Sequence, residues 1–146
     1  MGEISYTKIL VPTDGSDYSF KAGEHAVYLA QLTGARLYVL YVVDTDMAFH
    51  SGIHYAEDVS GLEKSGPDAT GKIRSICERA GIPCEEMIIR GKPADVIVDT
   101  AEKTGASLIV IGSLGMSAIE RVLIGSVSDK VMRHAKCPVL LVRGQR

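Results

Sequence analysis

The chain has 146 residues, 46% of them hydrophobic, and its 16 basic and 18 acidic residues give a formal net charge of −2. This length predicts one domain over residues 1–146, and the mixed charges argue against a nucleic-acid partner. No apolar run is long enough to span a membrane, and the first residues lack the basic start and apolar core of a signal peptide, so we expect a cytoplasmic protein with no membrane partner.

Five apolar segments predict strands. Four of them are continuous apolar runs rather than alternating ones, which is typical of strands buried on both faces of a parallel sheet, and the third in chain order, EEMIIR, is weaker. In chain order they occupy residues 8–11, 37–43, 85–90, 108–111 and 139–142.

Helical spacing fills the gaps between these strands. Apolar residues recur every three or four positions in four segments, which begin near Ala22, Ile73, Ala94 and Val127. Pro93 suits the first position of the third helix, where a missing N–H is tolerated. Three of the helices are followed by a glycine suited to the left-handed cap position, namely Gly34, Gly81 and Gly105.

The alternation of strands and helices predicts an α/β fold, with a five-stranded parallel sheet and helices on both faces. From the pattern alone, the strand orders 2-1-3-4-5 and 3-2-1-4-5 both stay open. Ligands of such sheets bind beyond the carboxyl ends of the strands. Functional residues are therefore expected directly after strands.

The connection at about residues 44–66 is long for this fold and has no clear period, so we expect a mobile loop that serves as a lid or a partner surface. His50 and His54 lie in it, four positions apart. Ser51 and Gly52 make a helix there doubtful, so a solvated loop is favoured over a metal site.

Residues 66–73, GPDATGKI, nearly match the phosphate-binding pattern G-x-x-x-x-G-K-[ST]. Ile73 stands where the pattern needs Ser or Thr for Mg²⁺, and no strand precedes the segment to aim its N–H groups at phosphates. We therefore interpret it as a turn and helix start, with Asp68 or Thr70 as the N-cap.

The first strand ends in Val-Pro-Thr-Asp-Gly-Ser, residues 11–16. Asp14 thus stands at the carboxyl end of a strand. It is suited to a ribose hydroxyl or a Mg²⁺ ion, and the alternative is that it only caps the first helix.

The fourth strand is followed by residues 112–126, in which Gly112 and Gly115 precede a nine-residue spacer and Gly125-Ser126. The glycines can present bare backbone N–H groups to an anion, and a helix start after them adds its positive dipole end. The alternative is an ordinary glycine turn.

Ser126 and Asp129 at this helix start form a capping-box-like S-x-x-D. The hydroxyls of Ser126 and Ser128 are further candidate donors to phosphate. The alternative for Ser126 is a plain N-cap.

Together these segments resemble the universal stress protein family, in its single-domain, ATP-binding branch. Ile9–Ser16 reads ILVPTDGS, and residues 112–126 read as G-x2-G-x9-G-S. The segments Gly91–Ala94 and Cys137–Val142 also match the family's pattern. The resemblance covers the chain except for residues 44–65.

The resemblance implies a Rossmann-like sheet of order 3-2-1-4-5, similar to the adenine nucleotide alpha hydrolases, that binds ATP or AMP. It implies adenosine contacts from Pro12, Thr13 and Asp14, and adenine held at Val42. The phosphates would be held at the late glycine motif by Ile111, Gly112, Gly115, Met116, Gly125, Ser126, Val127 and Ser128. Relatives often carry His, Arg or Lys where Leu114 and Met116 stand here, which weakens the case for tight triphosphate binding or turnover.

The favoured function is therefore a regulatory, nucleotide-binding stress-response protein rather than an enzyme. The alternative is a slow ATPase or phosphotransferase that uses Mg²⁺ bound by Asp14. Catalysis would need a charge-stabilising group near the transferred phosphate.

The last predicted strand is uncharged and falls at an edge of the sheet in the order 3-2-1-4-5. Edges of this kind invite pairing with another chain. We therefore expect a homodimer that pairs this strand with its own copy about a twofold axis, through Val139, Leu140, Leu141 and Val142.

Overall fold

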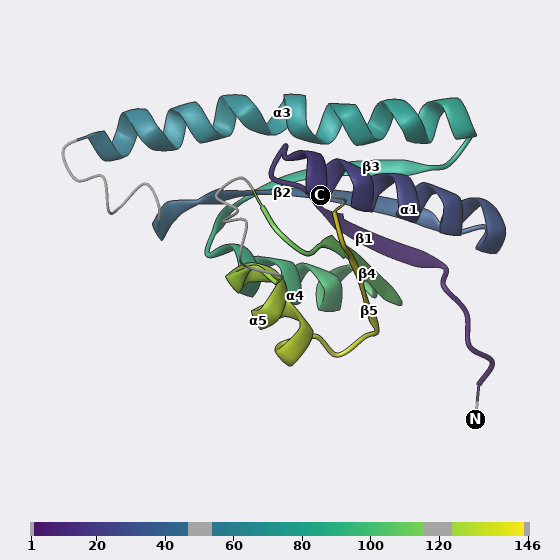
Figure 1. Ribbon diagram of the computed structural model, residues 1–146. Coiled ribbons are helices and arrows are strands. Elements are labelled where there is room, and N and C mark those ends of the chain that lie inside the picture. The colour runs from purple at the N-terminus through teal and green to yellow at the C-terminus, as the bar shows by residue number, and fades with distance from the viewer. Residues whose placement is uncertain (1, 47–53, 116–123, 145–146) are drawn as a thin grey trace.

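A computed structural model describes residues 2–46, 54–115 and 124–144 (Figure 1). Met116 and His50, both named above, lie outside these residues. The elements follow one another as β1 (Lys8–Pro12), α1 (Asp17–Thr33), β2 (Arg36–Asp44), α3 (Tyr55–Ala80), β3 (Cys84–Gly91), α4 (Pro93–Thr104), β4 (Leu108–Gly112), α5 (Ser126–His134) and β5 (Val139–Val142).

The five strands form one parallel sheet in the order β3-β2-β1-β4-β5, which confirms the predicted fold class and the order that the resemblance implied. Helices α1 and α3 cover one face, and α4 and α5 cover the other (Figure 1). β1 lies in the centre, between β2 and β4. The strand order reverses at β1, so the carboxyl ends of β1 and β4 border the crevice where ligands of this fold bind.

The inner strands β1, β2 and β4 are largely continuous apolar runs because both of their sides are buried. In β1, Ile9 and Val11 belong to the core under α1 and α3, whereas Leu10 between them belongs to the core under α4 and α5. All three side chains are fully buried. Removing an apolar side chain of this size from water contributes about 1.5–3 kcal/mol, so the centre of the sheet is a rigid base for its carboxyl edge.

The helix ends follow the sequence closely. Gly34, Gly81 and Gly105 adopt φ values of 74°, 70° and 70°, as the cap prediction requires. Each cap N–H donates to a carbonyl of its helix's last turn. Pro93 begins α4, as predicted.

Helix α3 is longer than the sequence indicated. It begins at Tyr55 and runs through Pro67, so the prediction of a loop over residues 44–66 is wrong for residues 55–66. The predicted helix start at Asp68 or Thr70 is wrong as well. Apolar packing against the sheet overrides the local signals of glycine and proline, because Val59 is buried together with Tyr41 in a cluster under the first half of α3.

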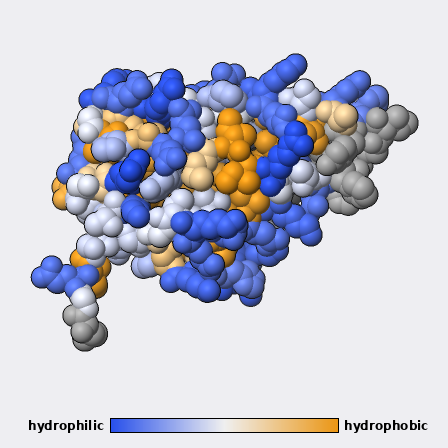
Figure 2. All heavy atoms as spheres, turned by 180° about the vertical axis from the view of Figure 1, so that it is seen from behind, coloured by the Kyte–Doolittle hydropathy of each residue, from blue (hydrophilic) through white to orange (hydrophobic). Residues whose placement is uncertain are grey.

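Seen from behind, the surface is mostly hydrophilic, and its broadest apolar area lies near the middle (Figure 2). In the described part of the chain, no helix is both long and apolar enough to cross a membrane.

Candidate functional site

The turn after β1 holds its polar residues in a fixed arrangement. The N–H of Thr13 donates to the carbonyl of Leu40 in β2 at 2.8 Å, which continues the sheet one residue past Pro12. Gly15 takes a φ of 86°, and its N–H donates to Thr13 Oγ1 at 3.2 Å. The turn therefore bends sharply at the strand end, and a non-glycine residue at position 15 would be strained.

Asp14 projects from this turn. Its side chain is exposed, and its Oδ1 accepts the N–H of Ser16 at 3.0 Å. Ser16 is the N-cap of α1, with its hydroxyl accepting the N–H of Ser19 at 3.2 Å. Because Ser16 caps the helix, the alternative that Asp14 is merely the cap is wrong, and the Asp14 carboxylate is oriented at the carboxyl edge of the sheet.

The late glycine motif meets Asp14 directly. A Cβ placed on Gly115 would lie 2.5 Å from Asp14 Oδ2, which is closer than such atoms approach. The predicted neighbourhood of the two motifs is therefore present: the backbone after β4 lies against the carboxylate after β1. Only glycine at position 115 allows this approach without moving Asp14.

Gly112 has a different surrounding. A Cβ there would lie 2.9 Å from the carbonyl oxygen of Tyr18, so this glycine lets β4 pack against the first turn of α1. Ile111, just before it, is 5% exposed and belongs to the core under α4 and α5. These two residues support the site from beneath.

The start of α5 is tied to the end of β4 through Ser113. The Gly125 N–H donates to the Ser113 carbonyl at 2.6 Å, and Ser128 Oγ donates to the same carbonyl at 3.0 Å. Gly125 is the N-cap, so the prediction that Ser126 caps the helix is wrong. The Asp129 side chain pairs with Arg133 at 3.0 Å in place of the predicted capping box.

This arrangement places the N-terminus of α5 beside the end of β4. The N–H of Asp129 makes the first bond within the helix, to the Gly125 carbonyl at 2.9 Å. The N–H groups of Ser126, Val127 and Ser128 therefore lie ahead of the helical bonding pattern. Ser126 is exposed, whereas the hydroxyl of the buried Ser128 is directed to backbone carbonyls, so Ser126 is the better placed of the two predicted hydroxyl donors.

The end of β2 lies beside the turn that carries Asp14. Pro12 and Leu40 are the last registered pair of β1 and β2, and Asp14 and Val42 each lie two residues further along. Val42 is half-buried.

Tyr41, which the sequence analysis did not single out, is 5% exposed, and burial together with the nearby Asp14 charge raises the pKa of its phenol. Its position near a strand's carboxyl end was the signal that could have identified it.

Residues 66–73 form no loop. They lie inside α3, where a Cβ on Gly66 would lie 2.9 Å from Ile88 Cδ1 and 3.0 Å from Tyr41 Cδ1. Gly66 thus serves close packing between helix and sheet, which confirms that the segment is not a phosphate-binding loop.

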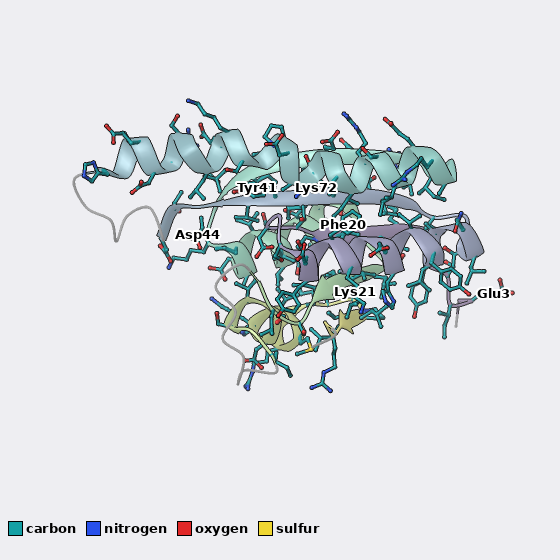
Figure 3. All side chains as sticks on the ribbon, turned by 45° about the horizontal axis from the view of Figure 1, so that its top comes forward. Glu3, Phe20, Lys21, Tyr41, Asp44 and Lys72 are labelled. Atoms are coloured by element: carbon teal, nitrogen blue, oxygen red, sulfur yellow. The ribbon has the colours of Figure 1, made fainter. Side chains whose placement is uncertain are left out.

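Lys72 of α3 lines a pocket of about 350 Å³ with Gly15, Asp17, Phe20 and Ser75. Figure 3 shows Lys72 and Phe20 side by side on α3 and α1. The pocket lies between α1 and α3, beside the turn that carries Asp14.

A metal has few protein ligands here. Within residues 2–46, 54–115 and 124–144, no group of three or more His, Cys, Asp or Glu side chains is arranged to hold an ion. His54 is exposed and pairs with Glu57 at 3.3 Å. The Mg²⁺ prediction therefore depends on Asp14 together with ligands from the phosphates themselves.

Comparison with known proteins gives a consistent result. The profile described as "Universal stress protein family" matches residues 5–143. The universal stress protein MJ0531 of Methanocaldococcus jannaschii is 38% identical over 97% of this chain and 85% of its own length.

Solved structures agree with the sequence relatives. Hypothetical protein MJ0577 superposes with a TM-score of 0.87 at 28% identity, covering 98% of this chain and 99% of its own. Universal stress protein UspA of Lactobacillus plantarum superposes with a TM-score of 0.84 at 32% identity, covering 97% and 100%. A universal stress protein solved in complex with cAMP superposes with a TM-score of 0.66 at 28% identity, covering 95% and 98%.

Proposed function

This chain belongs to the universal stress protein family, and from that premise we propose that it is a regulatory stress-response protein that binds an adenine nucleotide, ATP or AMP, at the carboxyl edge of its sheet. The observation that carries the proposal is the contact between the two motifs. A Gly115 Cβ would lie 2.5 Å from Asp14 Oδ2, so a carboxylate and a bare backbone border one crevice. The relative solved with cAMP supports the same ligand class.

The chemistry of the crevice suits the two ends of a nucleotide. The Asp14 carboxylate accepts hydrogen bonds, as ribose hydroxyls require, or it neutralises a Mg²⁺ ion that accompanies the phosphates. The N-terminus of α5, with Ser126 and the N–H of Val127, supplies donors and a positive dipole end to the phosphates. Adenine would lie toward the end of β2, next to Val42. Pro12 and Thr13, both buried, would form the floor beneath the ribose.

Calorimetric titration of the purified chain with ATP, AMP and cAMP tests this proposal. We expect saturable binding of at least one of them at one site per chain. Asp14→Ala should weaken nucleotide binding. The control is Lys103→Ala, which should leave binding unchanged, because Lys103 is an exposed residue of α4 that pairs with Asp99 at 2.8 Å. Absence of heat with all three nucleotides, from a protein with a native circular dichroism spectrum, would contradict the proposal.

A slow ATPase or phosphotransferase is the competing activity. It would use the same Asp14 through a bound Mg²⁺. A phosphate-release assay separates the two, since a regulatory binder should show no release above that of Asp14→Ala.

We further propose that the chain is a homodimer paired through β5. This strand forms one edge of the sheet, and its four residues carry no charge. Leu140 is 37% exposed, although it is a large apolar residue. Pairing two copies of β5 antiparallel would satisfy the backbone groups of both edges and cover this side chain.

Analytical ultracentrifugation tests the dimer. The wild-type chain should sediment as a dimer at micromolar concentration, and Leu140→Lys should shift it toward monomer with nucleotide binding kept. Tyr28→Lys, at an exposed apolar position on α1, is the matched control and should leave the dimer intact. A monomeric wild type, with and without ATP, would overturn this proposal.

A further inference from the structure

Three hydroxyl side chains form a hydrogen-bonded group under the turn after β1. They belong to Thr13 in the turn, Ser16 at the N-cap of α1 and Ser19 in the first turn of that helix. All three residues are buried, with exposed fractions of 6%, 6% and 5%. Ser19 lies outside both sequence segments that make up the proposed site, so its place in this group calls for a separate account.

Ser19 stands at the centre of the group because its hydroxyl has only one proton to donate. Its Oγ donates to the Ser16 carbonyl at 2.9 Å, so it accepts from the other two hydroxyls. Thr13 Oγ1 therefore donates to Ser19 Oγ at 2.9 Å, and Ser16 Oγ donates to it at 3.3 Å. One side chain thus sets the direction of all three hydroxyl protons.

The same group holds the turn that carries Asp14. With its proton directed at Ser19, Thr13 Oγ1 presents a lone pair to the N–H of Gly15 at 3.2 Å. Ser16 Oγ accepts the N–H of Ser19 at 3.2 Å, and the N–H of Ser16 donates to Asp14 Oδ1 at 3.0 Å. The backbone is therefore held on both sides of Asp14, and the last of these bonds orients its carboxylate.

Ser19 also lies against the start of the late glycine motif. A Cβ on Gly112 would lie 3.3 Å from the backbone nitrogen of Ser19 and 2.9 Å from the carbonyl oxygen of Tyr18. The end of β4 therefore packs on the same turn of α1 that supports Asp14. This helical turn sets the position of the carboxylate relative to the glycines after β4.

We propose that Ser19 is a positioning residue of the nucleotide site. Its hydroxyl sets the directions of the Thr13 and Ser16 hydroxyls. Through them it keeps the Asp14 carboxylate beside Gly115, whose Cβ would lie 2.5 Å from Asp14 Oδ2. This inference rests on the proposed nucleotide binding, and it adds that the affinity depends on a buried hydroxyl that does not itself touch the ligand.

Removal of this hydroxyl should loosen the turn while every group that faces the ligand is retained. In Ser19→Ala, the buried hydroxyls of Thr13 and Ser16 lose their shared acceptor and have to turn toward other partners. The bonds that hold the two sides of Asp14 then weaken. We expect nucleotide affinity to fall roughly fivefold in calorimetry, as the loss of one hydrogen bond implies.

Ser107→Ala is the matched control. The Ser107 Oγ accepts the N–H groups of Thr7 and Lys8 at 3.1 and 3.3 Å, and it donates to the Lys8 carbonyl at 3.0 Å. It is therefore another hydroxyl that holds backbone, but it lies where β1 begins. This variant should lower the midpoint of thermal unfolding and leave nucleotide affinity unchanged, which separates a loss of stability from a loss of positioning.

A second readout needs no nucleotide. Amide hydrogen exchange followed by NMR reports whether the N–H of Ser16 keeps its bond to Asp14 Oδ1. We expect exchange at Gly15 and Ser16 to be faster in Ser19→Ala than in wild type. Ser107→Ala should show wild-type rates at both positions.

Thr13→Val keeps the experiment decisive if Ser19→Ala does not fold. It nearly retains the side-chain shape and removes the same hydrogen bond from its other end, so exchange at Gly15 and Ser16 should quicken as well. Unchanged exchange and affinity in a folded Ser19→Ala would overturn the proposal, and so would an equal loss of affinity in Ser107→Ala. If wild type bound no nucleotide while Ser19→Ala still quickened exchange, the proposed function would fail and the hold of Ser19 on the turn would stand.

Discussion

Residues 66–73 and residues 112–126 both carry glycines at spacings that suggest phosphate binding, but only the second segment follows a strand. The first lies within α3, where Gly66 packs against the side chains of Ile88 and Tyr41. The second follows β4, where Gly115 meets the Asp14 carboxylate. The difference teaches that the groups a glycine contacts in the fold, rather than its spacing in the sequence, indicate whether it allows close core packing or borders a candidate ligand site.

The substitution Gly115→Val should have the largest effect on this comparison. Its side chain would enter the space beside Asp14 Oδ2, so we expect loss of detectable nucleotide binding in calorimetry. A native circular dichroism spectrum is the control for folding. Unchanged affinity would show that the phosphates do not bind at the late glycine motif.

The matched substitution Gly66→Val should act on stability instead. Its Cβ would overlap Tyr41 and Ile88, and overpacking of a core typically costs about 1–3 kcal/mol. We expect a lower urea midpoint, with nucleotide affinity retained in the folded protein. If Gly66→Val abolished binding at full stability, the contrast between the two segments would fail.

Ser126→Ala sharpens the comparison within the second segment. A hydrogen bond to a charged group contributes about 1.5–3 kcal/mol, so loss of one donor should weaken ATP binding roughly tenfold to a hundredfold. Calorimetry is the measurement. Because Gly125 is the N-cap, stability should change little, and an unchanged affinity would show that only backbone N–H groups contact the phosphate.

Lys72→Ala should have the smallest effect, with nucleotide affinity nearly unchanged. Lys72 lines the pocket next to Gly15, near the turn that carries Asp14. Its removal therefore tests whether a nearby lysine outside the late glycine motif contributes to nucleotide binding. A loss of binding comparable to that of Gly115→Val would show that the phosphates bind on the side of α1 and α3 instead.

The fold was predictable because its local signals agree with its global pattern. Continuous apolar runs, helical stripes and glycine caps all indicate a parallel α/β sheet, and Gly34 and Gly105 occupy the cap conformation that they suggested. The start of α3 was missed because Gly66 and Pro67 are local helix breakers. Their cost is offset by burial of residues such as Val59, which depends on the finished sheet and is not visible locally.

The closeness of Asp14 to the late glycine motif was predictable for a similar reason. Strand ends identified Asp14 and the glycine motif, and the strand order brought them together. The cap of α5 was not predictable, because it depends on the Ser113 carbonyl, which accepts from both Gly125 and Ser128. Contacts of this kind arise only once β4 and α5 are adjacent.

The glycine caps that end α1, α3 and α4 lie at the edge of the sheet where strands begin, and the proposed nucleotide site lies where strands end. Changes at one edge are thus separated from the other by the length of a strand. Substitutions at the caps should therefore change the stability of the fold without touching the residues around Asp14 and Gly115.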